Sequence, residues 1–252
     1  MGVPTAALTF WDPGILVGPA AMNGSARGTA LVVLVLGVPL LALTGFGPRS
    51  GRLPWLAART GALAFVTYNA VLFAFATPFN RLFLLYVALL GLAVWTFTTN
   101  LVELLRRPVS PGRWSRPLAV WLGTVTLGNA VLWLASIVPT VSAEQPQRAI
   151  DGLGVATNPV WVQDLAVWLP AAAVVAVALW RGRGWSTPAA ASLTTYWVLE
   201  AVSVAVDQWF GSRADPSSTV VSAAVVPGFL LLAAVGCVPA VTLLRTTSER
   251  RA

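Results

Sequence analysis

The sequence predicts an all-α integral membrane protein: a seven-helix bundle with its N-terminus outside and its C-terminus in the cytoplasm. Of the 252 residues, 57% are hydrophobic and only 10% are charged, and the mean hydropathy is +0.76. A soluble domain carries about 25% charged residues to cover its surface. The apolar residues also form long stretches with arginines clustered between them. Lipid is the solvent that suits such a chain, and its length suits one helical domain over residues 1–252.

Seven apolar stretches each supply roughly the 20 residues that a helix needs to cross about 30 Å of hydrocarbon. The predicted spans are 29–47, 55–76, 82–102, 117–139, 164–181, 187–209 and 219–244. Four prolines inside these spans are expected to kink their helices, because proline removes a backbone donor. They are Pro39, Pro170, Pro227 and Pro239. The residues before the first span lack a basic start and a cleavage site, so they are not expected to form a removable signal peptide.

The distribution of arginines predicts the orientation. One side of the bundle receives eleven of them: Arg49, Arg52, Arg106, Arg107, Arg113, Arg116, Arg181, Arg183, Arg245, Arg250 and Arg251. The other side receives four: Arg27, Arg81, Arg148 and Arg213. Arg59 is left out of the comparison because it lies inside the second span. Cytoplasmic loops carry the excess of positive charge, so the first side is predicted to be cytoplasmic.

Missing residue types exclude several mechanisms. All 16 basic residues are arginine, so a lysine Schiff base and a Walker-type phosphate lysine are excluded. The absence of histidine excludes a Ser-His triad, histidine-ligated haem and the usual catalytic zinc sites. Cys237 is the single cysteine, so one chain cannot hold a dithiol centre. We therefore expect no cofactor and no metal site.

The net charge of +7 does not predict a nucleic-acid partner. The arginines lie in short clusters between apolar segments instead of forming one basic face, which is the pattern of membrane topology.

A polar stripe on the sixth span is the strongest functional candidate. Glu200 lies well inside this span, and helical spacing places Tyr196, Ser203 and Asp207 on the same face. An ionisable residue costs about 2.5–3.5 kcal/mol at the centre of a membrane helix, so the stripe is expected to face the bundle interior. Glu200 and Asp207 are the candidate catalytic residues, as proton donor or relay. The alternatives are a structural hydrogen bond for Glu200 and a position at the outer rim for Asp207.

Polar residues on other spans are expected to meet this stripe. Together with Tyr196 and Ser203 they are the candidate substrate-binding residues: Tyr68, Asn69, Arg81, Asn129 and Asp164. Arg81 and Asp164 begin their spans on the outer side, so Arg81 is expected to pair with Asp164 or Asp207. Each residue taken singly is more often a hydrogen bond between helices. The functional interpretation therefore depends on their convergence.

Two stretches show a family resemblance. Tyr68-Asn69 is followed at 79–89 by Phe-Asn-Arg-Leu-Phe-Leu-Leu-Tyr-Val-Ala-Leu, and 164–185 begins Asp-Leu and ends Leu-Trp-Arg-Gly-Arg-Gly-Trp. Both resemble an uncharacterised family of polytopic bacterial membrane proteins, and together they cover most of residues 53–185. No activity is established for that family, so the resemblance implies the fold and the membrane location alone. The polar stretch 196–207 departs from the family's less polar continuation.

Three functions from different classes follow from these residues. The leading hypothesis is binding of an apolar lipid or isoprenoid-like molecule, with acid-catalysed cyclisation or isomerisation as the specific chemistry. Glu200 would protonate an olefin, and Trp and Tyr faces would stabilise a carbocation. The alternatives are a proton-coupled small-molecule transporter with Glu200 as the relay, and a non-catalytic scaffold. The expected partners are membrane lipids and an apolar small molecule, and the expected location is the bacterial cytoplasmic membrane.

Overall fold

The computed structural model describes residues 1–252 except 13, 48, 50, 144–145 and 250–252. Within the described residues, seven helical units are long and apolar enough to cross a membrane. Three are composite: α2 (Ala20–Val32), η1 (Val33–Gly37) and α3 (Val38–Phe46); α7 (Pro159–Gln163), η3 (Asp164–Trp168) and α8 (Leu169–Trp180); η4 (Ala223–Val225) and α10 (Val226–Glu249). The others are α4 (Leu53–Phe75), α5 (Phe83–Leu105), α6 (Ser115–Val141) and α9 (Ser186–Ala214). The predicted all-α, seven-helix membrane bundle is confirmed, and the chain is a multi-pass membrane protein.

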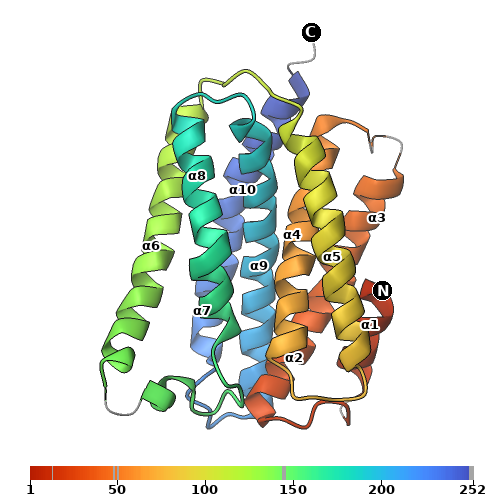
Figure 1. Cartoon of the computed structure of the whole chain (residues 1–252), viewed down its shortest axis with the longest axis vertical. Helices are drawn as coiled ribbons and strands as arrows, with labels where there is room; N and C mark the ends of the chain where they lie inside the picture. The colour runs from red at the N-terminus through yellow and green to blue at the C-terminus, as the bar shows by residue number, and fades with distance from the viewer. Residues whose placement is uncertain (13, 48, 50, 144–145, 250–252) are drawn as a thin grey trace.

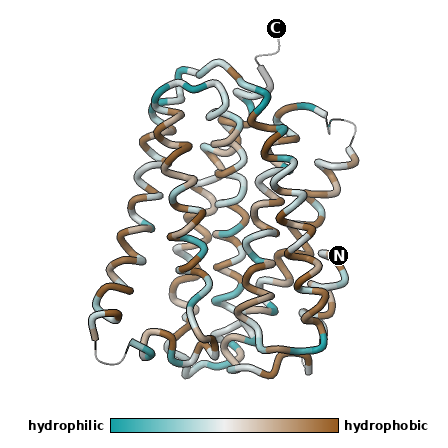
Figure 2. Tube along the Cα trace, in the orientation of Figure 1, coloured by the Kyte–Doolittle hydropathy of each residue, from teal (hydrophilic) through white to brown (hydrophobic). Residues whose placement is uncertain are grey.

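The bundle is centred on α4 and α9, which are buried along most of their length, whereas α5, α6 and α10 expose most of theirs (Figure 1). Hydrophobic colours run along the helices and hydrophilic colours gather mainly at the loops of the two ends (Figure 2). The loops after α3, α5 and α8 lie at one end, here called the arginine-rich end, and those after α1, α4, α6 and α9 lie at the opposite end. The arginine-rich end is the one predicted to be cytoplasmic.

The first and last spans differ from the predicted 29–47 and 219–244. The first begins nine residues earlier, at Ala20, because its polar residues are satisfied locally. The Asn23 amide donates to the carbonyls of Leu16 and Gly18, and Arg27 Nε donates to the carbonyl of Phe10. The last span begins at Ala223, so Pro227 stands at the start of α10 and does not kink it.

Pro39 and Pro170 each follow a π-helical turn. The ring of a proline clashes with the carbonyl four residues earlier. Those carbonyls belong to Val35 and Ala166, and both residues lie inside the π turns η1 and η3. The predicted kinks are therefore wide turns that place an extra residue in the helix, a feature frequent at functional sites.

A short helix at the chain start, α1 (Gly2–Trp11), lies outside the seven predicted spans. Thr5, Ala6 and Thr9 are fully buried on one of its faces, and the Thr9 hydroxyl lies 3.0 Å from that of Tyr86 on α5. Ten residues reach only about 15 Å along a helix axis, half the hydrocarbon thickness. Figure 1 accordingly shows the N-terminus about midway along the bundle.

Glycines allow α9 to lie close to two neighbours. A Cβ atom at Gly24 of α2 would lie 2.6 Å from the carbonyl oxygen of Phe210, and one at Gly28 would lie 2.7 Å from the Cα of Asp207. On α4, a Cβ at Gly61 would lie 2.4 Å from the carbonyl oxygen of Ser192. Small residues at membrane-helix interfaces permit this close backbone approach. The contacts fix the face that α9 turns toward α2 and α4.

Candidate functional site

The centre of the site is a hydrogen bond between α4 and α9. Glu200 is the fifteenth of the 29 residues of α9, so it lies at the midpoint of that helix. The Asn69 amide nitrogen donates to Glu200 Oε2 at 2.9 Å and to the carbonyl of Phe65 at 2.9 Å. Asn69 is 1% exposed, whereas Glu200 is half-buried. The structure thus brings together two residues that the sequence proposed for one site.

The polar stripe of α9 lies along the face that packs on its neighbours. Tyr196 and Ser203 are buried, and Glu200 and Asp207 are half-buried, so each carboxyl lies within the bundle yet keeps some accessible surface. Among the described residues, Asn69 Oδ1 and Ser203 Oγ are buried without a hydrogen-bond partner. An unsatisfied buried polar atom costs about 1–3 kcal/mol. The stripe and its partner Asn69 therefore carry an energetic cost, at two buried atoms, that the rest of the fold must offset.

A cavity of about 170 Å³ lies toward the opposite end, and Asp207 lines it. It is bounded by α2, α4, α7, α9 and the connecting residues 153–155 and 220–221. Asp207 Oδ1 accepts from the Gln208 amide at 3.1 Å, and Gln208 Oε1 accepts from the backbone of Ser222 at 2.9 Å. Its lining, as far as the described residues go, includes no basic side chain. Asp207, for which the alternative prediction was a position at the outer rim, thus lines a small cavity toward that end of the bundle.

Asp164 belongs to a second polar group, on the span formed by α7, η3 and α8. Its Oδ2 accepts from the indole nitrogen of Trp133 on α6 at 2.8 Å, and the Tyr68 hydroxyl lies beside the same carboxyl. Asp164 is 7% exposed. The π turn that begins at Asp164 positions it between α4 and α6. Its partners are neutral donors, so the site holds a third carboxyl without a contacting arginine.

An aromatic cluster fills the space between these carboxyls. The ring centroids of Trp168 and Tyr196 are 4.8 Å apart, and Tyr68 lies 5.8 Å from Tyr196 and 6.1 Å from Trp168. Phe97 of α5 lies 5.9 Å from Trp168. The Trp168 indole also donates to Gln163 Oε1 at 3.2 Å. Tyr68 and Tyr196, both proposed from the sequence, therefore pack against each other within the core, with their rings tilted by 45°.

Two proposed residues lie apart from this group. Arg81 was expected to pair with Asp164 or Asp207, and this is wrong: it forms an exposed ion pair with Asp12, just after α1. Asp12 could not be predicted as the partner, because α1 is too short to be recognised as a span. Asn129 is half-buried on α6, which packs mainly on α8. The side-chain amide that donates to Glu200 is that of Asn69.

Several site residues were missed from the sequence. They are Trp133, Gln163, Trp168 and Gln208. The Gly24-x-x-x-Gly28 spacing was a readable signal for a close helix contact at Asp207. Within the described residues, no group of three or more His, Cys, Asp or Glu side chains is placed to hold a metal ion.

Comparison with known proteins adds no relative: no protein-family model, no curated protein and no solved structure matches the chain. This outcome is consistent with the resemblance to an uncharacterised family, and the seven apolar helices agree with the fold and location that the resemblance implies.

Proposed function

We propose that the chain is a proton-coupled transporter of a small organic cation, with Glu200 as the proton-carrying group and Asp207 at the entry site. The observation that carries the proposal is the Glu200 carboxyl at the midpoint of α9, with Asn69 as its hydrogen-bond donor. The ion pairs among the described residues are Arg81–Asp12 and Arg107–Glu103, both away from Glu200. A carboxylate at this depth is expensive without a counter-charge. A proton or a bound cation supplies this counter-charge. Exchange of one for the other at Glu200 couples proton movement to cation movement.

The cavity at Asp207 favours a cation over an anion. Its charged lining residue is a carboxylate, and the remaining lining is apolar apart from hydroxyls such as Thr29 and Thr77 and the Gln208 amide. Its volume of about 170 Å³ lies below the range of about 300–1,000 Å³ found for drug-sized ligands. An ammonium group with a small apolar body fits both the charge and the size.

Buried hydroxyls continue the polar path beyond Glu200 toward the arginine-rich end. They lie on the first half of α9: Ser186, Thr187, Ser192, Thr194 and Thr195. Among the described residues, the Thr187 hydroxyl has no hydrogen-bond partner. Glu200 therefore has polar groups on both sides along one helix, as a group that exchanges protons between two compartments requires. The excess of arginine supports the proposal that the arginine-rich end is cytoplasmic. The proposed location is the bacterial cytoplasmic membrane.

The test uses the purified chain in liposomes that contain the pH indicator pyranine. External tetramethylammonium, which is permanently charged, should raise the internal pH, because each cation that enters displaces one proton from Glu200 to the outside. Glu200→Gln, which keeps the size and removes the titratable proton, should abolish the signal. Asp207→Asn should weaken the apparent affinity. Glu103→Gln is the matched control, since Glu103 pairs with Arg107 at the end of α5. A wild-type protein that neither binds tetramethylammonium nor moves protons would overturn the proposal.

The aromatic cluster favours a second candidate, the acid-catalysed cyclase or isomerase of an isoprenoid-like lipid. The faces of Tyr68, Trp168 and Tyr196 lie near Glu200, and such faces stabilise carbocations. The cavity, however, lies at Asp207 and is small, so the transporter is the better supported function. Lipid mass spectrometry of the protein purified from its native membrane, followed by turnover assays with Glu200→Gln, separates the two. A wild-type chain that shows neither activity would favour the non-catalytic scaffold.

A further inference from the structure

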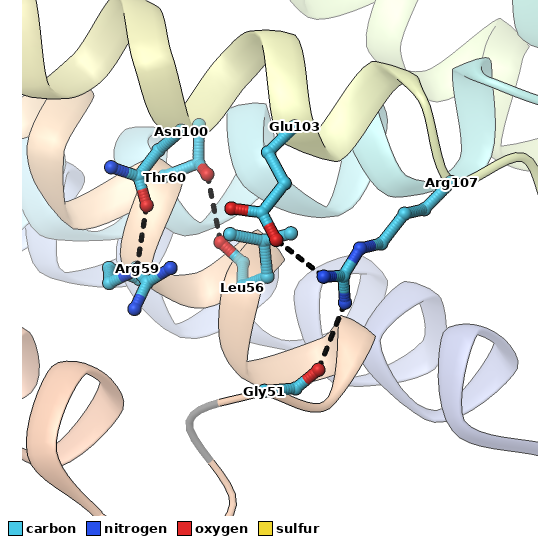
Figure 3. Close-up of polar contacts among 7 residues, drawn as sticks. All are labelled: Gly51, Leu56, Arg59, Thr60, Asn100, Glu103 and Arg107. Carbon is cyan, nitrogen blue, oxygen red and sulfur yellow. Dashed lines mark hydrogen bonds and ion pairs between the residues drawn. The ribbon is translucent and has the colours of Figure 1, made fainter.

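An independent polar contact lies at the other end of the bundle, between Arg59 of α4 and Asn100 of α5 (Figure 3). Arg59 Nε donates to Asn100 Oδ1 at 2.7 Å, and the Asn100 amide nitrogen donates to the carbonyl of Thr96 at 2.8 Å. Arg59 is the seventh residue of α4, about 9 Å from the start of that helix at the arginine-rich end. The guanidinium is therefore held within the membrane span, on one fixed partner.

The remaining donors of Arg59 have no partner among the described residues. Within the part of the chain that the structure describes, the one hydrogen bond of the guanidinium is that of Nε, which leaves both Nη groups. Arg59 and Asn100 are half-buried, so the Nη groups are not enclosed by the bundle. A guanidinium with spare donors at this depth needs an anionic acceptor, and its planar fork matches a phosphate.

The nearest acidic side chain is engaged elsewhere. Glu103 lies one turn beyond Asn100 on α5 and could have neutralised Arg59. It pairs instead with Arg107, which also donates to the carbonyl of Gly51 at 2.9 Å (Figure 3). The two contacts stand side by side in Figure 3 without a link between Arg59 and Glu103. Arg59 thus keeps its full charge for a partner outside the chain.

The residues at the same end as Arg59 suit both the headgroup and the acyl chains of a phospholipid. The exposed loop residues Arg49 and Arg52 and the exposed Arg106 add positive charge at the membrane surface. Large apolar side chains at the same end are exposed: Leu43 is 61% and Phe46 is 93% exposed. A basic cluster beside a membrane helix attracts anionic headgroups, while the apolar side chains suit acyl chains.

We propose that Arg59, positioned by Asn100, binds the phosphate of an anionic phospholipid from the leaflet at the arginine-rich end. Arg59 supplies the two Nη groups as a bidentate donor. Asn100 fixes the guanidinium plane and does not touch the lipid. This site is separate from the carboxyls of α9, so it stands whether or not the chain transports a cation.

The experiment measures binding of phosphatidylglycerol and phosphatidylcholine to the purified full chain by native mass spectrometry from detergent. Phosphatidylglycerol should bind more tightly than phosphatidylcholine. Arg59→Gln should lower the affinity for phosphatidylglycerol by about tenfold, because one charge-assisted contact is lost. Arg213→Gln is the matched control: it removes the same charge from an exposed residue in the last turn of α9, at the opposite end of the bundle, and should change the affinity by less than about twofold.

Two further variants keep the test decisive. Arg59→Lys retains the charge without the fork and should bind more weakly than the wild type but more tightly than Arg59→Gln. Asn100→Leu should weaken the binding of phosphatidylglycerol and leave that of phosphatidylcholine unchanged, because Arg59 loses its fixed orientation. Equal effects of Arg59→Gln and Arg213→Gln, equal binding of the two lipids, or displacement of phosphatidylglycerol by inorganic phosphate would each overturn the proposal.

Discussion

Asn69 and Glu200 lie on different helices and join their polar groups in the middle of the bundle, through an amide that donates at 2.9 Å. This bond links the two most buried helices, α4 and α9. The same carboxyl is the group to which the proposed function assigns the proton.

Replacing Asn69 by leucine should reduce the free energy of unfolding by about 1–3 kcal/mol, because Glu200 loses its donor in a buried position. The measurement is equilibrium unfolding of the purified chain in detergent micelles. A double replacement, Asn69→Leu with Glu200→Leu, should recover part of the loss, since neither polar group then lacks a partner. Purely additive losses would show that the two side chains are not coupled.

The contact of Gly61 with α9 predicts a strong response to a single methyl group. A Cβ atom there would lie 2.4 Å from the carbonyl oxygen of Ser192, so Gly61→Ala should destabilise the chain by about 1–3 kcal/mol. Gly91→Ala on α5 is the control, because a Cβ there meets no atom within 4 Å. Alanine is the better helix former, so this change should be neutral or stabilising. Similar melting temperatures for both variants would contradict the close α4–α9 packing.

The indole of Trp133 is predicted to stabilise the buried carboxyl of Asp164. Trp133→Phe removes the 2.8 Å hydrogen bond and should cost about 1–3 kcal/mol in the same unfolding measurement. Trp95→Phe makes the same change on a side chain that is 72% exposed on α5, and should stay within about 0.5 kcal/mol of the wild type. If the two variants unfold alike, Asp164 does not depend on Trp133.

Orientation is predicted from the arginines and can be tested with single cysteines. Cys237 is exposed, so it is first replaced by serine. Ser110→Cys lies between α5 and α6 at the arginine-rich end, and Thr219→Cys lies between α9 and α10 at the opposite end; both positions are exposed. A membrane-impermeant maleimide added to intact cells should label position 219 and leave position 110 unlabelled. The reverse pattern would invert the predicted orientation.

The convergence of Glu200 with Asn69 was predictable because both residues are polar and central in apolar helices, and such residues seek each other. The partners of Arg81 and Asp164 could not be predicted in this way. Arg81 meets Asp12 because α1, a ten-residue helix, brings that residue alongside. Trp133 lies in an apolar span, and only the packing of α6 brings its N–H to Asp164. Spacing along one helix determines which residues share a face, but not which neighbour the face meets.

The sequence by itself determined that the chain is a membrane bundle of seven helices, because only lipid accommodates so much apolar surface and each span must satisfy its own backbone. It also determined that the carboxyls of α9 share one face, because the helical repeat is fixed. The tertiary structure alone decided that Asn69 bonds Glu200, that a cavity opens at Asp207 and that Arg59 is held by Asn100. These depend on the rotation and close approach of helices distant in sequence, which the packing of Gly24, Gly28 and Gly61 sets.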